Sequence, residues 1–270
     1  MSTSNIKLIH GDCLIEMQKI PDKSIDMVLC DLPYEVLHKS NPNTQWDKKI
    51  PFESLWEQYE RIIKDNGAIV LFAQGMFTAE LMTSNTKLWR YNLVWDKQRV
   101  TGFLNANRMP LRCHEDICVF YKSLPTYNPQ FEIGLHNHSR GTGIHKNTNN
   151  CYGKYNAEYK GGTYDNKNLK RVPKTTEDNN KFPKSIISIK KEHESTTLHP
   201  TQKPIALLEY LINTYSNEGD TILDNTMGSG STMVACWNTK RNGIGIELND
   251  EYFAIAEKRV KEAQQQITLF

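Results

Sequence analysis

The chain has 270 residues, 38% hydrophobic and 24% charged, which is long enough for one large α/β domain or two smaller ones with a substantial buried core. No apolar run reaches the roughly 20 residues of a membrane-spanning helix, and the first residues lack the apolar core of a signal peptide. We therefore expect a protein of the reducing cytoplasm with no membrane partner. The six cysteines are scattered, and Cys113, His114 and Cys118 match no zinc spacing, so no metal site is expected.

Short apolar runs predict strands at residues 6–10, 24–30, 67–73, 91–95, 116–121, 220–224 and 242–247. Apolar residues at helical spacing predict helices at residues 51–64, 203–216, 231–240 and 249–266. Strands that alternate with helices indicate an α/β fold with a doubly wound, mostly parallel sheet.

The pattern stops between residues 123 and 193, where Asn, Gly, Lys and Tyr dominate. Residues 122–193 carry 13 Lys/Arg against 6 Asp/Glu, a net charge of +7 that leaves −5 for the rest of the chain. Such asymmetry points to a polyanionic partner, and tyrosines interleaved with cations can contact both bases and phosphates. We interpret this segment as a DNA-contacting insertion; a solvated insertion with no such role is the alternative. The candidate DNA-binding residues are Arg140, Lys146, Lys154, Lys160, Lys170 and Arg171.

The stretch "DLPY" follows the apolar run of residues 25–30. Pro33 has no N–H for a sheet and biases Leu32 towards an extended conformation, so the strand is predicted to stop there. Asp31 and Tyr34 are then displayed at the carboxyl end of a strand, which is the edge where open α/β sheets bind ligands.

The stretch "DTILDNTMGSGSTMVA" predicts a strand ending at Asp224, a turn with Gly228 and Gly230, and a helix from Ser231. Glycines let the backbone approach a ligand, and a helix N-terminus offers free N–H groups. Glu247, 19 residues after Gly228 at the end of the next strand, can accept hydrogen bonds from ribose hydroxyls. This arrangement indicates an adenosine site, whereas the incomplete G-x-G-x-x-G disfavours a nicotinamide dehydrogenase.

A further segment, "HPTQKP" at residues 199–204, directly precedes a predicted helix. Together and in this order, DLPY, the basic middle, HPTQKP, DNTMGSGST and GIELND resemble the β class of amino DNA methyltransferases. The resemblance covers nearly all of the chain outside residues 123–193, and the five elements in one order are highly specific.

The resemblance implies a seven-stranded Rossmann-like methyltransferase sheet in circularly permuted chain order. It divides the chain into a catalytic half (1–122), a target-recognition insertion (123–193) and a cofactor-binding half (194–270). It implies S-adenosylmethionine as methyl donor and DNA as substrate, and it leaves a homodimer and a cognate restriction endonuclease open as further partners. The residues that it places at the cofactor are Asp12, Cys13, Asp31, Thr201, Lys203, Asp224, Met227, Gly228, Ser229, Gly230, Ser231, Thr232, Glu247 and Leu248.

The resemblance also assigns catalysis to Asp31, Leu32, Pro33 and Tyr34. The amino nitrogen of a base is a poor nucleophile, and Asp31 with the carbonyl of Leu32 can accept its N–H groups while Tyr34 stacks on the extruded base. Asp31 in place of Ser favours N6 of adenine; N4 of cytosine and a non-catalytic DNA-binding module are the alternatives. Leu32 stands where the family usually has Pro, and Asn225 and Thr226 replace a usual Pro-Phe pair beside the cofactor.

Overall fold

The computed structural model describes residues 4–35, 48–133, 180–191 and 202–266. The chain divides into two compact units, one made of residues 1–130 and 184–270 and the other of residues 131–183. The three-part division expected from the sequence remains a prediction.

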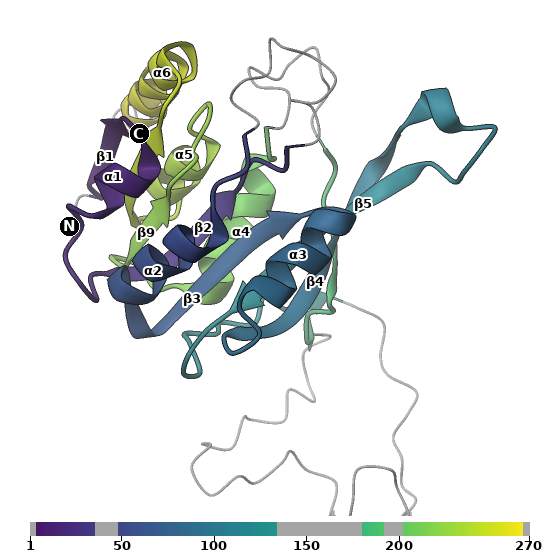
Figure 1. Cartoon of the computed structure of the whole chain (residues 1–270), viewed down its shortest axis with the longest axis horizontal. Helices are drawn as coiled ribbons and strands as arrows, with labels where there is room; N and C mark the ends of the chain where they lie inside the picture. The colour runs from purple at the N-terminus through teal and green to yellow at the C-terminus, as the bar shows by residue number, and fades with distance from the viewer. Residues whose placement is uncertain (1–3, 36–47, 134–179, 192–201, 267–270) are drawn as a thin grey trace, which may run out of the picture. The chain divides into compact units, whose positions relative to one another are not determined.

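The first unit is built on an eight-stranded sheet in the order β1-β10-β9-β2-β3-β5-β4-β8 (Figure 1). Every pairing is parallel except those of β5, which runs antiparallel to both of its neighbours. The fold expected from the sequence is therefore confirmed. In sheet order the strands are β1 (Ile6–His10), β10 (Asn242–Glu247), β9 (Thr221–Asp224), β2 (Ile25–Asp31), β3 (Ile63–Ala73), β5 (Arg112–Phe120), β4 (Trp89–Thr101) and β8 (Ile186–Ser188).

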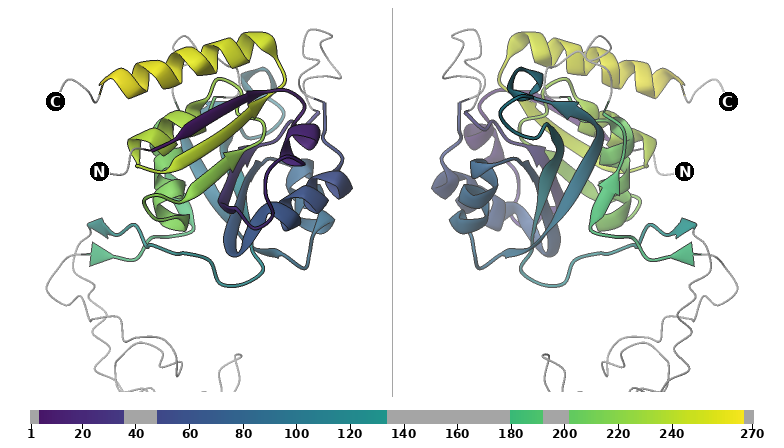
Figure 2. Two further views of the ribbon diagram at one scale, coloured as in Figure 1. Left: turned by 90° about the vertical axis from the view of Figure 1, so that its left-hand side faces the viewer. Right: turned by 90° about the vertical axis from the view of Figure 1, so that its right-hand side faces the viewer.

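Helices cover both faces of this sheet, as Figures 1 and 2 show. One face carries α1 (Cys13–Met17), α2 (Phe52–Ile62) and α3 (Met76–Ser84), and the other carries α4 (Ile205–Tyr215), α5 (Ser231–Asn238) and α6 (Asp250–Gln266). No helix among the described residues is long and apolar enough to cross a membrane.

Alternate side chains of β2 supply the two cores. Met27 and Leu29 pack towards α4 and α5, whereas Val28 and Cys30 pack towards α1 and α2, and all four are at most 1% exposed. A strand buried on both faces reads as a continuous apolar run, which is why the sequence identified β2 so clearly.

All seven predicted strands occur, and the sheet has an eighth. The expected count of seven was one too low, because β8 is only three residues long with Ile187 alone buried, too short to show a period. It pairs parallel to β4 at the sheet edge. Two short helices, α1 and α3, were also not predicted.

In the second unit the structure describes a two-stranded antiparallel sheet of β6 (Glu132–Ile133) and β7 (Asn180–Lys181). The rings of Phe131 and Phe182 lie 5.0 Å apart beside it. The six candidate DNA-binding residues between Arg140 and Arg171 lie outside the described residues.

Candidate active site

A cavity of about 930 Å³ lies at the carboxyl ends of β2, β9 and β10. Parallel pairing of β9 with both β2 and β10 brings these three ends to one edge of the sheet. Segments that are almost 200 residues apart in sequence therefore share one site. Its wall contains the following predicted residues: Asp12, Cys13, Asp31, Leu32, Pro33, Tyr34, Lys203, Asp224, Met227, Gly228, Ser229, Ser231, Thr232, Glu247 and Leu248. Thr201 lies outside the described residues.

Asp31, the last residue of β2, receives hydrogen bonds on both carboxylate oxygens. The hydroxyl of Tyr34 donates to Oδ1 at 2.7 Å, and Nζ of Lys203 donates to Oδ2 at 2.5 Å. The turn after the strand is anchored by Leu32, which is 3% exposed, and by the ring of Tyr34, which stacks on Phe77 with centroids 4.6 Å apart. The carboxylate is therefore held in a defined position in the cavity wall.

Behind Asp31 the charges alternate in a four-charge network of Lys97, Glu115, Lys203 and Asp31. Lys203 reaches Oε2 of Glu115 at 3.3 Å as well as Asp31, and Lys97 reaches Oε1 of Glu115 at 3.2 Å. Lys97 and Lys203 are 2% and 8% exposed. Buried charges persist only when they are paired, so each member of the network depends on its neighbours.

Burial and the neighbouring charges together set the pKa values of Asp31, Lys203 and Glu115. Burial raises the pKa of Asp31 above its usual value, Lys203 opposes that rise, and the nearby charge of Glu115 adds to it. For Lys203, burial alone would lower the pKa, but Asp31 and Glu115 together raise it. Burial would likewise raise the pKa of Glu115, and Lys203 and Lys97 hold it below its usual value. Lys203 therefore favours the charged form of Asp31, while Glu115 disfavours it.

Glu247, also in the cavity wall, binds the glycine turn through its carboxylate. Its Oε2 accepts the N–H of Gly228 and its Oε1 accepts the N–H of Asn249, both at 2.8 Å. Burial raises the pKa of Glu247, and the backbone hydrogen bonds oppose that rise. The carboxylate is thus fixed between two loops in the cavity wall.

Asn225 and Thr226, where this chain departs from the related motif, connect the glycine turn to its surroundings. Oγ1 of Thr226 donates to the carbonyl oxygen of Asp31 at 3.0 Å. Oδ1 of Asn225 accepts from the hydroxyl of Tyr59 at 2.5 Å, whereas its buried Nδ2 has no hydrogen-bond partner among the described residues. Because Asn225 lines the cavity, this unused donor fits a polar atom of a ligand.

Gly230 has a packing reason to be glycine. Its φ of +79° is left-handed, and a Cβ there would lie 2.9 Å from Cβ of Ala256 on α6. The residue permits close approach of α5 and α6, and the turn before α5 is then held by Arg259, whose guanidinium donates to the carbonyl oxygen of Ser229 at 2.7 Å. Asp12 also has a structural role, because its carboxylate caps α1 through the N–H of Leu14 at 2.8 Å.

Sequence reasoning did not identify Glu115, Lys97, Gln202 or Thr226 as site residues. The available signal was a charged residue beside an apolar strand run: Lys97 lies two residues after the run of residues 91–95, and Glu115 lies directly before the run of residues 116–121. That signal marks a buried charge but does not name its partner, because the partner comes from another strand.

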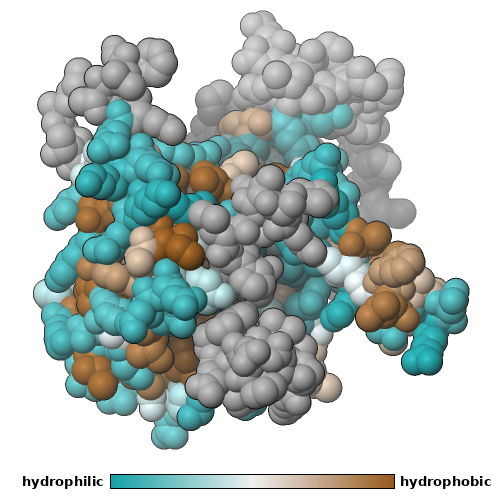
Figure 3. Space-filling view, turned by 90° about the horizontal axis from the view of Figure 1, so that it is seen from above, coloured by the Kyte–Doolittle hydropathy of each residue, from teal (hydrophilic) through white to brown (hydrophobic). Residues whose placement is uncertain are grey.

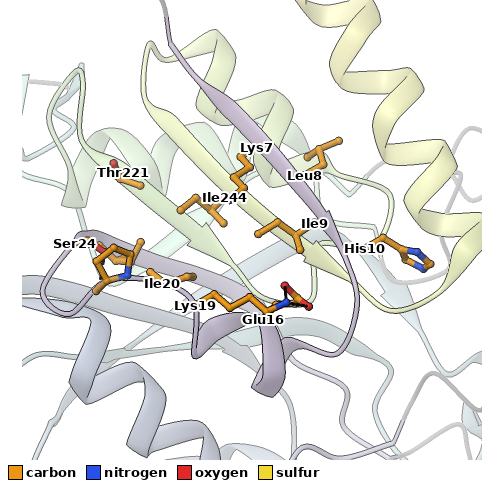
Figure 4. Close-up of a pocket in the computed structure, with 12 residues that line it drawn as sticks. Lys7, Leu8, Ile9, His10, Glu16, Lys19, Ile20, Ser24, Thr221 and Ile244 are labelled. Atoms are coloured by element: carbon orange, nitrogen blue, oxygen red, sulfur yellow. Dashed lines mark hydrogen bonds and ion pairs between the residues drawn. The ribbon is translucent and has the colours of Figure 1, made fainter.

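A second cavity of about 580 Å³ lies beside β1 and α1 (Figure 4). Its wall includes the aliphatic side chains of Leu8, Ile9, Ile20 and Ile244, and its acid Glu16 is paired with Lys19 at 2.7 Å. Among the described residues, no group of three or more His, Cys, Asp or Glu side chains could hold a metal ion.

Comparison with known proteins agrees with this geometry. A family model described as DNA methylase matches residues 25–258. The chain is 27% identical over 262 residues to Type II methyltransferase M.HpaI of Haemophilus parainfluenzae, covering 94% of this chain and 74% of that protein. It is 26% identical over 262 residues to the DNA adenine methyltransferase YhdJ of Escherichia coli (strain K12), covering 95% of this chain and 83% of that protein.

Two solved structures share the fold. The M1.HpyAVI–SAM complex aligns with a TM-score of 0.59 and 23% identity over 94% of this chain and 98% of that chain. The cytosine-N4-specific PvuII DNA methyltransferase aligns with a TM-score of 0.61 and 15% identity over 98% of this chain and 93% of that chain.

Proposed function

Because this chain belongs to the DNA methylase family, we propose that it transfers a methyl group from S-adenosylmethionine to N6 of adenine in DNA. The observation that carries the proposal is that Asp31 and Glu247 both lie in the wall of one cavity, the first suited to an amino group and the second to a ribose. The name of the relative YhdJ, a DNA adenine methyltransferase, supports adenine, as does Asp at position 31.

In this proposal the glycine turn and Glu247 hold the adenosine part of S-adenosylmethionine. The buried Nδ2 of Asn225 and the α5 N-terminus, with Ser231 and Thr232, offer further polar contacts in the same wall. When bound, the cofactor supplies an electrophilic methyl group on a sulfonium.

Asp31 is the proposed acceptor for an N–H of the target amino group. The nitrogen lone pair of adenine is delocalised into the ring, and an N–H hydrogen bond to a carboxylate returns electron density to nitrogen. This contact strengthens as the nitrogen gains positive charge, so it lowers the barrier more than it improves binding. The hydrogen bond from Thr226 to the carbonyl oxygen of Asp31 fixes the backbone at the point where the acid is displayed.

Lys203 is a positioning residue in this scheme, because it holds Oδ2 of Asp31 and favours its charged form. We expected Lys203 to border the methionine end of the cofactor, and its place in the cavity wall is compatible with both roles. Tyr34 is proposed to stack on the adenine, which must leave the duplex before its amino group can react.

DNA is the partner of the enzyme, and two further partners are part of the proposal. The relative M.HpaI is named a Type II methyltransferase, which supports a restriction endonuclease of matching specificity. A homodimer and a cytoplasmic location remain predictions, to be tested by sedimentation and by cell fractionation.

The test of the proposed function is to incubate the protein with unmethylated plasmid DNA and S-adenosylmethionine and to digest the product to nucleosides. Mass spectrometry should show N6-methyladenine with the wild type and almost none with Asp31→Ala. N4-methylcytosine in its place would show that the enzyme methylates N4 of cytosine, the alternative target. DNA binding without any methylated nucleoside would support a non-catalytic module.

A further inference from the structure

The β4–β5 hairpin extends beyond the sheet and away from the helices (Figure 1). Its two strands pair from Trp89 opposite Phe120 to Thr101 opposite Arg112, with an irregular register between Asp96 and Thr101. A short 3-10 helix (η1), Phe103–Asn105, forms the end of the hairpin. We call residues 100–109 the hairpin tip.

The hairpin tip exposes large apolar side chains. Val100, Phe103, Leu104 and Met109 are 59%, 79%, 94% and 55% exposed. Figure 3 shows apolar side chains gathered on this projection. Single exposed apolar residues are ordinary, but four within ten residues form a patch of the kind that marks an interaction surface.

The same segment is positively charged. Residues 98–114 contain Arg99, Arg108 and Arg112 and no Asp or Glu. An apolar patch surrounded by arginines, without acids, fits a polyanion better than it fits another acidic or neutral protein surface.

The base of the hairpin belongs to the wall of the active-site cavity. Trp95 on β4 and Arg112 and Glu115 on β5 line that cavity. Leu104 is three residues beyond Thr101, the cross-strand partner of Arg112, and three residues span at most about 10 Å. The apolar tip therefore adjoins the part of the cavity wall that Arg112 forms, in the same cavity whose wall contains Asp31.

We propose that the hairpin tip inserts Phe103 and Leu104 into the base stack beside the extruded adenine while Arg99 and Arg108 contact the flanking phosphates. Extrusion leaves a gap in the duplex, and apolar side chains placed between base steps can stabilise such an unstacked site. This inference rests on the proposed function, since it assigns a role in duplex opening to a hairpin beside the same cavity.

The first test compares Phe103→Ala/Leu104→Ala with the wild type and with Leu124→Ala. Leu124 lies outside the hairpin tip and is 72% exposed, so this variant controls for the loss of an exposed apolar side chain. Duplex DNA carries the mapped site, either intact or with an abasic position opposite the target adenine. We expect the double variant to lose at least tenfold in kcat/KM on the intact duplex, with most of that loss recovered on the abasic duplex, where less stacking and pairing must be broken. The control should stay within twofold.

Equal loss on both duplexes, or no loss on either, would overturn the proposal. A change in sedimentation from dimer to monomer in the double variant would also overturn it, and would assign the tip to contact with a second copy of this chain.

A binding measurement tests the arginines without any methyl transfer, so its outcome is independent of the proposed function. Fluorescence anisotropy with a duplex of mixed sequence gives the slope of log affinity against log salt. Arg99→Gln/Arg108→Gln should reduce the steepness of that slope by about 2, because each lost phosphate contact removes about 0.9. Lys258→Gln/Lys261→Gln, on the exposed side of α6, should leave it unchanged. An unchanged slope in the arginine variant would refute a phosphate contact by the hairpin.

Discussion

The four-charge network predicts that Lys203→Gln and Glu115→Gln shift the pH dependence of methyl transfer in opposite directions. Asp31 must be ionised to accept the amino N–H, so the rate falls as pH drops through its pKa. Lys203 lowers that pKa and Glu115 raises it. The acidic limb of the rate profile should therefore move to higher pH in Lys203→Gln and to lower pH in Glu115→Gln.

Both substitutions should also destabilise the fold. Lys203→Gln leaves the carboxylates of Asp31 and Glu115 close together without the cation between them, and Glu115→Gln leaves Lys97, 2% exposed, without its anion. Breaking a buried pair typically costs about 3–5 kcal/mol, which corresponds to a fall in Tm of about 6–20 °C in a chain of this size. Both variants should lose stability, whereas their acidic limbs should shift in opposite directions. A general structural defect would therefore not account for the pH shifts.

The assay is single-turnover methyl transfer from pH 5 to 9 at saturating S-adenosylmethionine, with thermal unfolding of the same samples. Lys23→Gln is the control, because its partner Asp65 is 65% exposed at the side chain and surface pairs contribute about 0–1 kcal/mol. Shifts of the acidic limb in the same direction, or no shift in either variant, would refute the role assigned to the network.

Three further substitutions test other parts of the site. Burial raises the pKa of Asp224 to about 6, so its contribution to stability is fully present below pH about 4 and is lost as pH rises towards 6, by roughly 3 kcal/mol. Asp224→Asn should remove that decline in urea unfolding measured between pH 4 and 6, and an unaltered pH dependence would contradict the assignment. Glu247→Gln loses the charge and one acceptor for the N–H groups of Gly228 and Asn249, so calorimetry should show S-adenosylmethionine binding about 10- to 100-fold weaker. Equal affinity would exclude Glu247 from the cofactor site. Tyr34→Phe keeps the ring that stacks on Phe77 but removes the hydrogen bond that lowers the pKa of Asp31, so the maximal rate should be retained while the acidic limb moves to higher pH. A large fall in the maximal rate would show that the hydroxyl takes part in the chemistry itself.

The sequence by itself determined the elements whose signals are local. The strand at residues 25–30 is apolar except for Asp26 because both of its faces are buried, and Pro33 ends it because proline cannot donate to the sheet. The glycine turn before α5 was readable because a left-handed φ at Gly230 needs glycine. Parallel β-α-β order then placed the carboxyl ends of these strands at one edge, so Asp31, Gly228 and Glu247 could be nominated together.

Only the tertiary structure decided which charged side chains meet, and which departures from the related motif make contacts in the site. Lys97, Glu115 and Lys203 come from β4, β5 and the segment before α4, and sheet pairing and helix packing bring their side chains behind Asp31. No periodicity encodes such contacts, because a buried charge is stabilised by whichever partner the fold brings within about 4 Å. Thr226 stands where the related motif has Phe, yet its hydroxyl donates a hydrogen bond to the carbonyl oxygen of Asp31, a residue 195 positions away. The sequence thus specified the groups at the sheet edge, whereas their hydrogen bonds and pKa shifts depend on distances that exist only in the folded chain.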